Sequence, residues 1–358
     1  MTHNVNGKDM VLFLPWILMI AMLAGCNGSA LDNGEARGQT IVTSIETEES
    51  QEPAMVETVQ DEAIKIKAQD VSSFFDGASK DQVRMEDYGY LVGERYVLYF
   101  DKDTSFPGDL KRQIEEIMLM DEQVLGISFS VTDFVENKNW LEVYYGDVFR
   151  GIPKYQDKIH VMLAKDENDG AIPWTDGNEI MLFDSDFDPN YSSREMVYHE
   201  IAHALRLRHS LFLGKVLEEG IGVYAQYHVA QLLDTPCWCC IQFLQSSAVG
   251  FDEAAVVADP EGKFREYNLG GRSKEQLEYQ YGFRLITFLM EEYGNDVIQR
   301  LSTNAAKYQF SEEDNDVIIL ILKETTSEDV FERFAAWLPE GWKRTSEDIE
   351  NSLKKYGY

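Results

Sequence analysis

The sequence is short of basic residues. Its 32 Lys and Arg stand against 63 Asp and Glu, which gives a formal net charge of −31 at pH 7. A surface this acidic repels phosphate backbones and anionic lipid headgroups, so the composition argues against nucleic acid as a partner. Hydrophobic residues still make up 44% of the chain and aromatic residues 12%, which indicates a packed globular core rather than a disordered chain.

Cysteine is equally scarce, with 4 in 358 residues. Cys237, Cys239 and Cys240 form one C-W-C-C cluster, and two of them can pair in an oxidising compartment. Because other residues that could bind a metal ion with these cysteines are lacking nearby, the cluster predicts a local disulfide or inert thiols. Apolar runs long enough to cross a membrane are also missing after the N-terminal segment.

The N-terminus is typical of a targeting segment. Lys8 precedes an apolar run of 16 residues at 10–25, which is short for a membrane span and suits the core of a signal peptide. The run ends in the letters L-A-G-C at 23–26, which resemble a bacterial lipobox. The resemblance implies a signal peptide at 1–25 and an acylated Cys26 that anchors the mature chain outside the cytoplasm. An ordinary secretory signal or an anchor helix is the alternative.

An acidic flexible tether is expected at 26–84, because this segment has too few large apolar residues to bury. The folded domain is expected at 85–358, strand-rich over 85–190 and helical over 191–358. Short apolar stretches predict strands at 94–100, 141–145, 158–163 and 178–183. Helical spacing predicts helices at 109–126, 192–208, 215–233, 274–293, 313–324, 327–338 and 345–355. This order predicts an α+β fold, with a small, mainly antiparallel sheet followed by a helical region.

Residues 199–209 read HEIAHALRLRH and contain the metal motif H-E-x-x-H. On a helix, His199 and His203 share one face, where two imidazoles can meet one tetrahedral zinc at about 2.0–2.1 Å. Glu200 lies beside such a metal and can take a proton from water bound there. The motif alone also occurs by chance on helices that hold no metal.

The candidates for the third metal ligand lie in two segments of the chain. The metzincin pattern H-E-x-x-H-x-x-G-x-x-H selects His209, but it needs a glycine where this chain has Arg206. If the helix continues through Arg206, His209 lies about 9 Å beyond His203 along the axis and on another face. His209 is then a histidine near a helix C-terminus, where a partly positive ring is favoured.

The segment LEEGIGVY at 217–224 resembles the L-x-E-G-x-A-x-Y segment of gluzincin zinc peptidases, including thermolysin-related and aminopeptidase-like families. The resemblance implies that Glu219 is the third ligand. Glu218 is its rival, although it points about 100° away on a helix. Fifteen residues, 204–218, separate His203 from Glu219, a few fewer than in the aminopeptidases, so a short loop must join the two helices.

A further segment at 279–289, YQYGFRLITFL, resembles the Y-x-x-G-x-x-L-x-x-x-L helix of the same clan. The resemblance implies that Tyr279 faces the metal and donates to the transition state. It also places the strand at 178–183 at a sheet edge, where it could pair with an extended peptide. Residues 177–181 read GNEIM rather than the G-x-M-E-N signature of aminopeptidases, which favours an endopeptidase.

These motifs together predict a lipid-anchored extracellular zinc metallopeptidase of gluzincin type that cleaves peptide or protein substrates. The expected zinc ligands are His199, His203 and Glu219, the expected catalytic residues are Glu200 and Tyr279, and the expected lipidation site is Cys26. Two alternatives stay open: a non-catalytic surface binding lipoprotein on a metallopeptidase scaffold, and a metzincin-like ligand set. The metzincin-like set is disfavoured because the sequence lacks the Met-turn that should follow the metal-binding helix.

Overall fold

The computed structural model describes residues 88–101, 104, 107–130, 158–165, 173–187, 194–237, 250–269, 275–311 and 313–357. All of them belong to one compact unit, Lys65–Tyr358. The expected signal peptide, the anchor Cys26, the tether and the strand expected at 141–145 lie outside the described residues.

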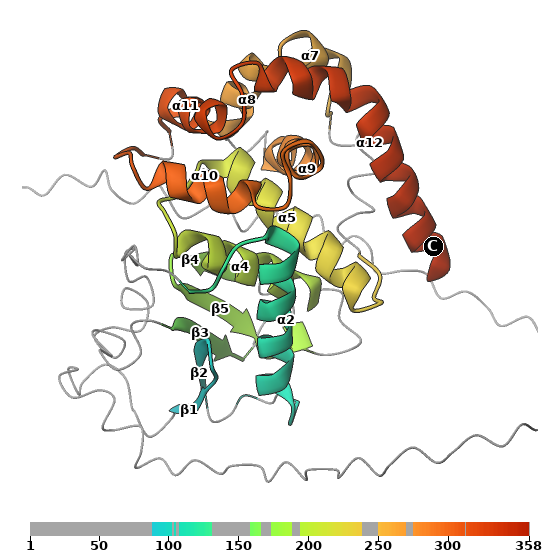
Figure 1. Ribbon diagram of the computed structural model, residues 1–358. Coiled ribbons are helices and arrows are strands. Elements are labelled where there is room, and N and C mark those ends of the chain that lie inside the picture. The colour runs from blue at the N-terminus through green and yellow to red at the C-terminus, as the bar shows by residue number, and fades with distance from the viewer. Residues whose placement is uncertain are drawn as a thin grey trace, which may run out of the picture. The chain divides into compact units, whose positions relative to one another are not determined.

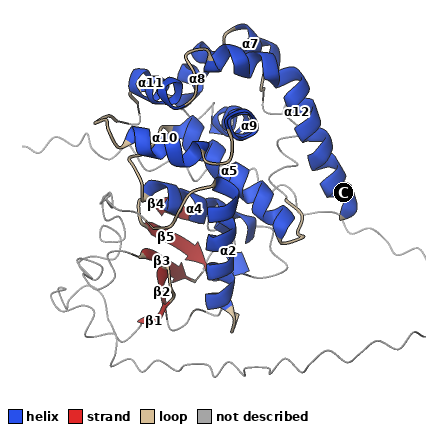
Figure 2. Cartoon of the chain, viewed as in Figure 1, coloured by secondary structure: helices blue, strands red, loops and turns tan. Residues whose placement is uncertain are grey.

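A five-stranded sheet forms the first part of the described fold, in the order β1-β2-β3-β5-β4. Its strands are β1 (Tyr88–Val92), β2 (Tyr96–Asp101), β3 (Ile159–Ala164), β4 (Trp174–Asp176) and β5 (Glu179–Phe183). A short 3-10 helix, η6 (Asp184–Phe187), follows β5. Figure 2 shows the strands gathered on one side of the helices. Three of the four strands expected from sequence are confirmed as β2, β3 and β5.

The sheet is mixed, whereas the sequence predicted a mainly antiparallel one. β1 pairs with β2 and β4 pairs with β5 in antiparallel fashion, but β2–β3 and β3–β5 are parallel. The helix α2 (Leu110–Leu125) lies in the connection between β2 and β3, and such a crossover lets the next strand run parallel to the last. The α+β class itself is confirmed.

The edge of the sheet is also not where the resemblance put it. β5 lies between β3 and β4, so the edge strand on this side of the sheet is the three-residue β4, and β1 forms the other edge. β4 and β5 are joined by a tight turn in which Gly177 has φ 59°, a left-handed value that favours glycine. A strand of three residues has no periodicity to read, which explains why the sequence did not predict it.

Alternate side chains of the sheet lie in one hydrophobic core, to which the helices also contribute side chains. The residues that β2, β3 and β5 contribute are Tyr96, Leu98, Ile159, Val161, Leu163, Ile180 and Leu182. The Tyr96 hydroxyl also donates to the Lys111 carbonyl at 2.8 Å, which ties α2 to β2. Figure 1 shows α2 beside the strands, with the remaining helices following.

Asp121 lies on the buried face of α2 and is fully buried. Within the described part of the chain, neither of its carboxylate oxygens has a hydrogen-bond partner. Burial therefore raises the pKa of Asp121 well above its usual value. A carboxyl with a raised folded-state pKa favours the fold only at low pH, and this contribution is lost as the pH rises towards the folded-state pKa.

We expect Asp121→Asn to raise the free energy of unfolding at pH 7 by at least about 1 kcal/mol, since one pKa unit corresponds to about 1.4 kcal/mol. The gain should shrink as the pH falls from 7 to 5, because less of the ionisation penalty remains. Urea unfolding at the two pH values measures this, with Glu116→Gln on the exposed face of α2 as control. Equal changes for both variants at both pH values would contradict a carboxyl buried without a partner.

The second part of the described fold is helical. Its helices are α4 (Arg194–Leu207), α5 (Lys215–Leu232), α7 (Glu253–Ala258), α8 (Pro260–Asn268), α9 (Glu275–Tyr293), α10 (Val297–Ala305), α11 (Asn315–Thr325) and α12 (Val330–Lys355). The sequence predicted α4, α5, α9 and α11 but missed α7, α8 and α10. Within the described residues, no helix combines the length and the apolar character that a membrane crossing requires.

The predicted break between 338 and 345 is wrong, because α12 continues through Pro339. Proline removes one helical hydrogen bond and strains the preceding turn. The helix is held by its apolar face instead, on which Phe334, Leu338, Trp342 and Ile349 are buried at helical spacing. Tertiary packing thus overrides the local signal at this position.

α5 and α9 cross closely, because a glycine lies on each helix at the contact. A Cβ on Gly220 would lie 2.5 Å from the carbonyl carbon of Gly282, a distance that side chains do not tolerate. Glycine at both positions therefore allows the backbones to touch. This contact places the start of α9, with Tyr279, beside the segment of α5 that carries Glu219.

Candidate metal centre

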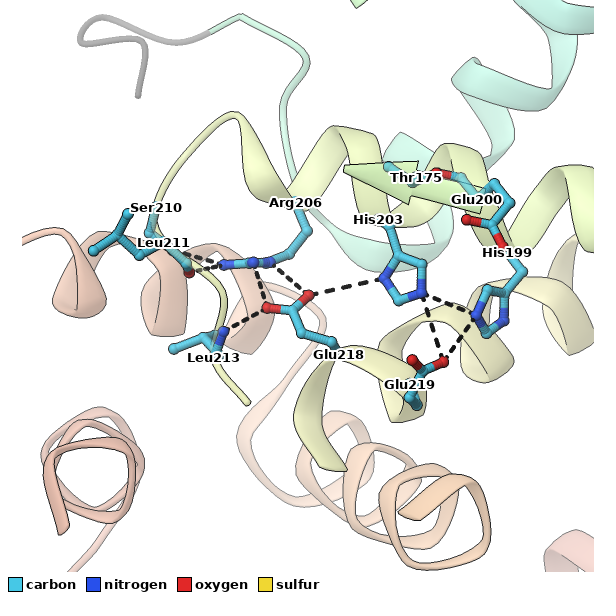
Figure 3. Close-up of polar contacts among 10 residues, drawn as sticks. All are labelled: Thr175, His199, Glu200, His203, Arg206, Ser210, Leu211, Leu213, Glu218 and Glu219. Atoms are coloured by element: carbon cyan, nitrogen blue, oxygen red, sulfur yellow. Dashed lines mark hydrogen bonds and ion pairs between the residues drawn. The ribbon is translucent and has the colours of Figure 1, made fainter. Parts of the chain in front are cut away.

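α4 and α5 bring two histidines and a glutamate to one point. His199 and His203 lie one turn apart on α4, and Glu219 lies on the first turns of α5. Their side chains converge, as Figure 3 shows, and they form a group of the described residues that could hold a metal ion. The structure thus brings together the three residues expected as ligands.

The three facing atoms are spaced as one small cation requires. His203 Nε2 lies 2.9 Å from His199 Nε2 and 3.8 Å from Glu219 Oε2, and His199 Nε2 lies 3.2 Å from the same oxygen. Two atoms bound to one tetrahedral zinc at about 2.0–2.1 Å lie about 3.4 Å apart. The three distances fall on both sides of this value, so the donor set fits one metal ion.

The charges at the site favour a cation. Burial lowers the pKa of His203, but the nearby carboxylates of Glu218, Glu219 and Glu200 outweigh burial and raise it to about 10. Burial raises the pKa of Glu219, but the hydrogen bond from His199 and the nearby His203 ring hold that pKa well below its usual range. The site therefore keeps an ionised carboxylate beside nitrogen donors, and a metal ion can take the place of the proton.

Glu200 lies next to the candidate ligands but is not part of the group that could hold the metal ion. Its backbone carbonyl accepts a hydrogen bond from Thr175 Oγ1 on β4 at 2.8 Å, which joins α4 to the edge strand. Its side chain is buried, and burial raises the pKa of Glu200, while the nearby His199 and His203 lower it. A glutamate with a raised pKa is suited to accept and release a proton near neutral pH.

His209 lies away from the metal centre. α4 ends at Leu207, so Arg206 lies within the helix and does not break it. His209 Nε2 donates to the Ser128 carbonyl at 2.5 Å, and its Nδ1 accepts from Gln299 Nε2 at 3.3 Å. Both ring nitrogens therefore have partners on other segments, which disfavours the metzincin-like set.

Glu218, the rival to Glu219, points to a different partner. Its Oε2 accepts from Arg206 Nε at 3.0 Å, and both residues are fully buried. The sequence did not predict this ion pair, because Arg206 could be read only as a helix former. The usable signal was a charged residue at 206 between two apolar residues, Leu205 and Leu207.

Gly222 on α5 supports the His199 ring. A Cβ at this position would lie 2.5 Å from His199 Cε1 and 2.7 Å from Nδ1 and Nε2. Side chains do not approach so closely, and a helix backbone and an imidazole ring cannot give way easily. Glycine at 222 therefore allows α5 to approach α4 closely enough for Glu219 to reach the histidines.

We expect Gly222→Ala to weaken Zn²⁺ binding at least about 10-fold, comparable to the loss of an outer-shell contact. The physical reason is the displacement of the His199 ring or of α5. Titration against a chromophoric chelator measures the affinity. Gly108→Ala is the control, because a Cβ there meets no atom within 4 Å. Equal affinities in the two variants would mean that this close approach does not shape the site.

Tyr279 lies beside the candidate metal ligands. Its ring centroid is 6.1 Å from that of His199. Burial, together with the charges of Glu219 and Glu278, raises the pKa of Tyr279 well above its usual value, so the hydroxyl keeps its proton. Tyr281 faces elsewhere, because its hydroxyl donates to the Pro260 carbonyl at 2.6 Å.

Cys237 is not part of the group of described residues that could hold the metal ion. Cys237 is buried, and Cys239 and Cys240 lie outside the described residues. The expected local disulfide or inert thiols therefore stay a prediction.

Comparisons with known proteins name no family. No family model matches the sequence, and no curated protein matches it. Among solved structures, the chain is similar to a functionally unknown conserved protein from Bacillus anthracis str. Ames, crystallised as a mutant, with a TM-score of 0.39 and 11% identity. The match covers 80% of this chain and 55% of that one, so this chain spans about half the length of that protein.

Proposed function

We propose that this chain is a zinc-dependent peptidase of gluzincin type that hydrolyses peptide bonds. The observation that carries the proposal is the convergence of His199 Nε2, His203 Nε2 and Glu219 Oε2, with the buried Glu200 beside them. Two histidines and a glutamate form a donor set typical of catalytic zinc, which keeps a fourth position for water or substrate.

Each residue has a separate task in the proposed reaction. Zinc, when bound, supplies a Lewis acid that polarises the scissile carbonyl and makes water more acidic. Glu200 accepts the proton of the attacking water and then transfers it to the leaving amine. The Tyr279 hydroxyl donates a hydrogen bond to the oxygen on which negative charge develops.

The position of β4 at an edge of the sheet supports an extended peptide as the substrate. This edge strand pairs only with β5 within the described sheet, and its Thr175 is hydrogen-bonded to the backbone of Glu200. An extended peptide can add to such an edge through backbone hydrogen bonds, which would hold it beside the metal centre. The sequence GNEIM at 177–181 lacks the aminopeptidase signature, which supports cleavage within a chain.

The direct test of the proposal is hydrolysis of an unstructured protein such as casein by the Zn²⁺-loaded chain. We expect turnover that a chelator removes and that added Zn²⁺ restores. Zinc bound without any turnover of several unstructured proteins and peptides would instead support the alternative, a non-catalytic binding lipoprotein on this scaffold.

Tyr279→Phe is expected to lower kcat about 10²–10³-fold, the usual cost of removing one oxyanion donor. KM should change little, because the hydrogen bond forms fully only in the transition state. Steady-state kinetics measures both constants, with Tyr281→Phe on the same helix as control. If only Tyr281→Phe is damaging, Tyr279 does not have this role and Tyr224 is the next candidate.

The proposal includes a lipid anchor at Cys26, which rests on the letters L-A-G-C at 23–26. The chain would then act at a membrane surface outside the cytoplasm, and several acyl chains on one cysteine would make its retention stable. Fatty-acid labelling tests this part separately. We expect labelling of the wild type and none of Cys26→Ala, and equal labelling would overturn the anchor.

A further inference from the structure

We propose that Arg206 is a positioning residue of the metal centre, which acts through Glu218 on the ligand His203. The inference rests on the metal site proposed above, since it concerns how that site is held. Arg206 takes the position at which the metzincin pattern has its glycine, so the chain uses a buried guanidinium where that pattern uses a turn.

The Arg206 side chain joins three segments of the chain. Its Nε donates to Glu218 Oε2 at 3.0 Å, and its Nη2 forms an ion pair with the other Glu218 oxygen. Its Nη1 donates to Ser210 Oγ at 2.8 Å and to the Leu211 carbonyl at 2.7 Å. One guanidinium thereby connects the last turn of α4, the short loop after it and the first turn of α5 (Figure 3).

Both oxygens of Glu218 are held in place. Oε1 accepts from the Leu213 backbone N–H at 2.6 Å, and Oε2 accepts from Arg206. An acid held in this way fixes the rotation of the first turn of α5. Because Glu219 follows directly and points about 100° away, fixing Glu218 also directs Glu219 towards the histidines.

Glu218 also faces the far side of the His203 ring. Glu218 Oε2 lies 3.8 Å from His203 Nδ1, which has no hydrogen-bond partner among the described residues. When His203 Nε2 binds a metal, Nδ1 carries the proton and needs an acceptor. A shift of about 0.8 Å brings the two atoms to hydrogen-bond distance, and Figure 3 shows the carboxylate between Arg206 and His203.

Arg206 is what keeps this acceptor in place. A buried carboxylate without a counter-charge is strongly disfavoured, so Glu218 would turn away if Arg206 were removed. His203 would then lose its orientation, and the metal would be bound less tightly. Partners of this kind typically contribute about 10–100-fold to metal affinity.

A purely structural ion pair makes a different prediction. A buried Arg–Glu pair can often be replaced by apolar residues without loss of stability. If Arg206 and Glu218 only hold the loop, such a replacement leaves metal affinity unchanged in the folded protein. If they position His203, the fold persists but the metal affinity falls.

The experiment measures Zn²⁺ affinity of the full chain, purified in detergent, by competition with a chromophoric chelator. The variants are Arg206→Met and the double variant Arg206→Met with Glu218→Leu. The double variant removes both charges, so no buried charge is left without a partner. Circular dichroism shows whether each variant is folded. Arg208→Met is the matched control, because Arg208 is buried two residues further on and bonds to Asn178 and Phe129 instead.

We expect the double variant to fold and to bind Zn²⁺ about 10–100-fold more weakly than the wild type. Its Co²⁺-loaded form should show an altered visible spectrum, and Arg208→Met should match the wild type in both measurements. A folded double variant with wild-type affinity and spectrum would overturn the positioning role of Arg206 and leave the proposed metal site standing. A wild type that binds no Zn²⁺ would overturn the metal site, and this proposal with it.

Discussion

Glu219→Ala should release the bound metal, whereas His209→Ala should retain it. Glu219 is one of the three proposed protein ligands, so its loss should cost more than the roughly 10–100-fold of an outer-shell contact. His209 has both ring nitrogens bonded to Ser128 and Gln299, away from the site. Elemental analysis of the purified variants measures the metal content per chain.

Glu218→Ala completes this comparison, because Glu218 is the neighbouring acid on α5. We expect it to weaken metal binding without abolishing it, since its carboxylate lies 3.8 Å from His203 Nδ1 rather than on the metal side of the ring. Loss of metal in His209→Ala together with retention in Glu219→Ala would reverse the ligand assignment and support a metzincin-like set.

Glu200→Gln should keep the metal and remove hydrolysis. The amide has nearly the same shape as the carboxylate but cannot accept a proton from water. A general base typically contributes about 10²–10⁴-fold to the rate. The buried position of Glu200 beside His199 and His203 places it where this proton transfer is needed. Turnover of casein by the metal-loaded variant measures the effect.

The control is Glu195→Gln, which changes a buried acid on the first turn of the same helix. Turnover close to that of the wild type is expected there. If Glu200→Gln and the wild type hydrolyse casein equally well, the proposed mechanism is wrong.

The two histidines of the candidate ligand set could be predicted because their meeting depends on local spacing. His199 and His203 are four residues apart, and a single helix is enough to put both on one face. Glu219 needed the resemblance of its segment to gluzincins, since a loop separates it from α4 and no local rule determines how α5 returns. The glycines at 220 and 222 explain physically why that segment can approach.

The contacts that hold the site could not be predicted. Arg206 and Glu218 are 12 residues apart, and their pairing depends on the path of the loop between them. The edge strand β4 is three residues long, too short for a strand pattern. Pro339 indicated a helix end, but packing of Leu338 and Trp342 against the core keeps α12 continuous. In each case a tertiary contact decides the outcome, which one sequence does not show.

The central claim is that His199, His203 and Glu219 hold one metal ion. Anomalous diffraction at the zinc edge, from crystals of the Zn²⁺-loaded chain, tests this claim most directly. The account predicts one strong peak about 2.0–2.2 Å from His199 Nε2, His203 Nε2 and Glu219 Oε2. A map without a peak between these three atoms, or with its main peak at His209 or Glu218, would contradict it.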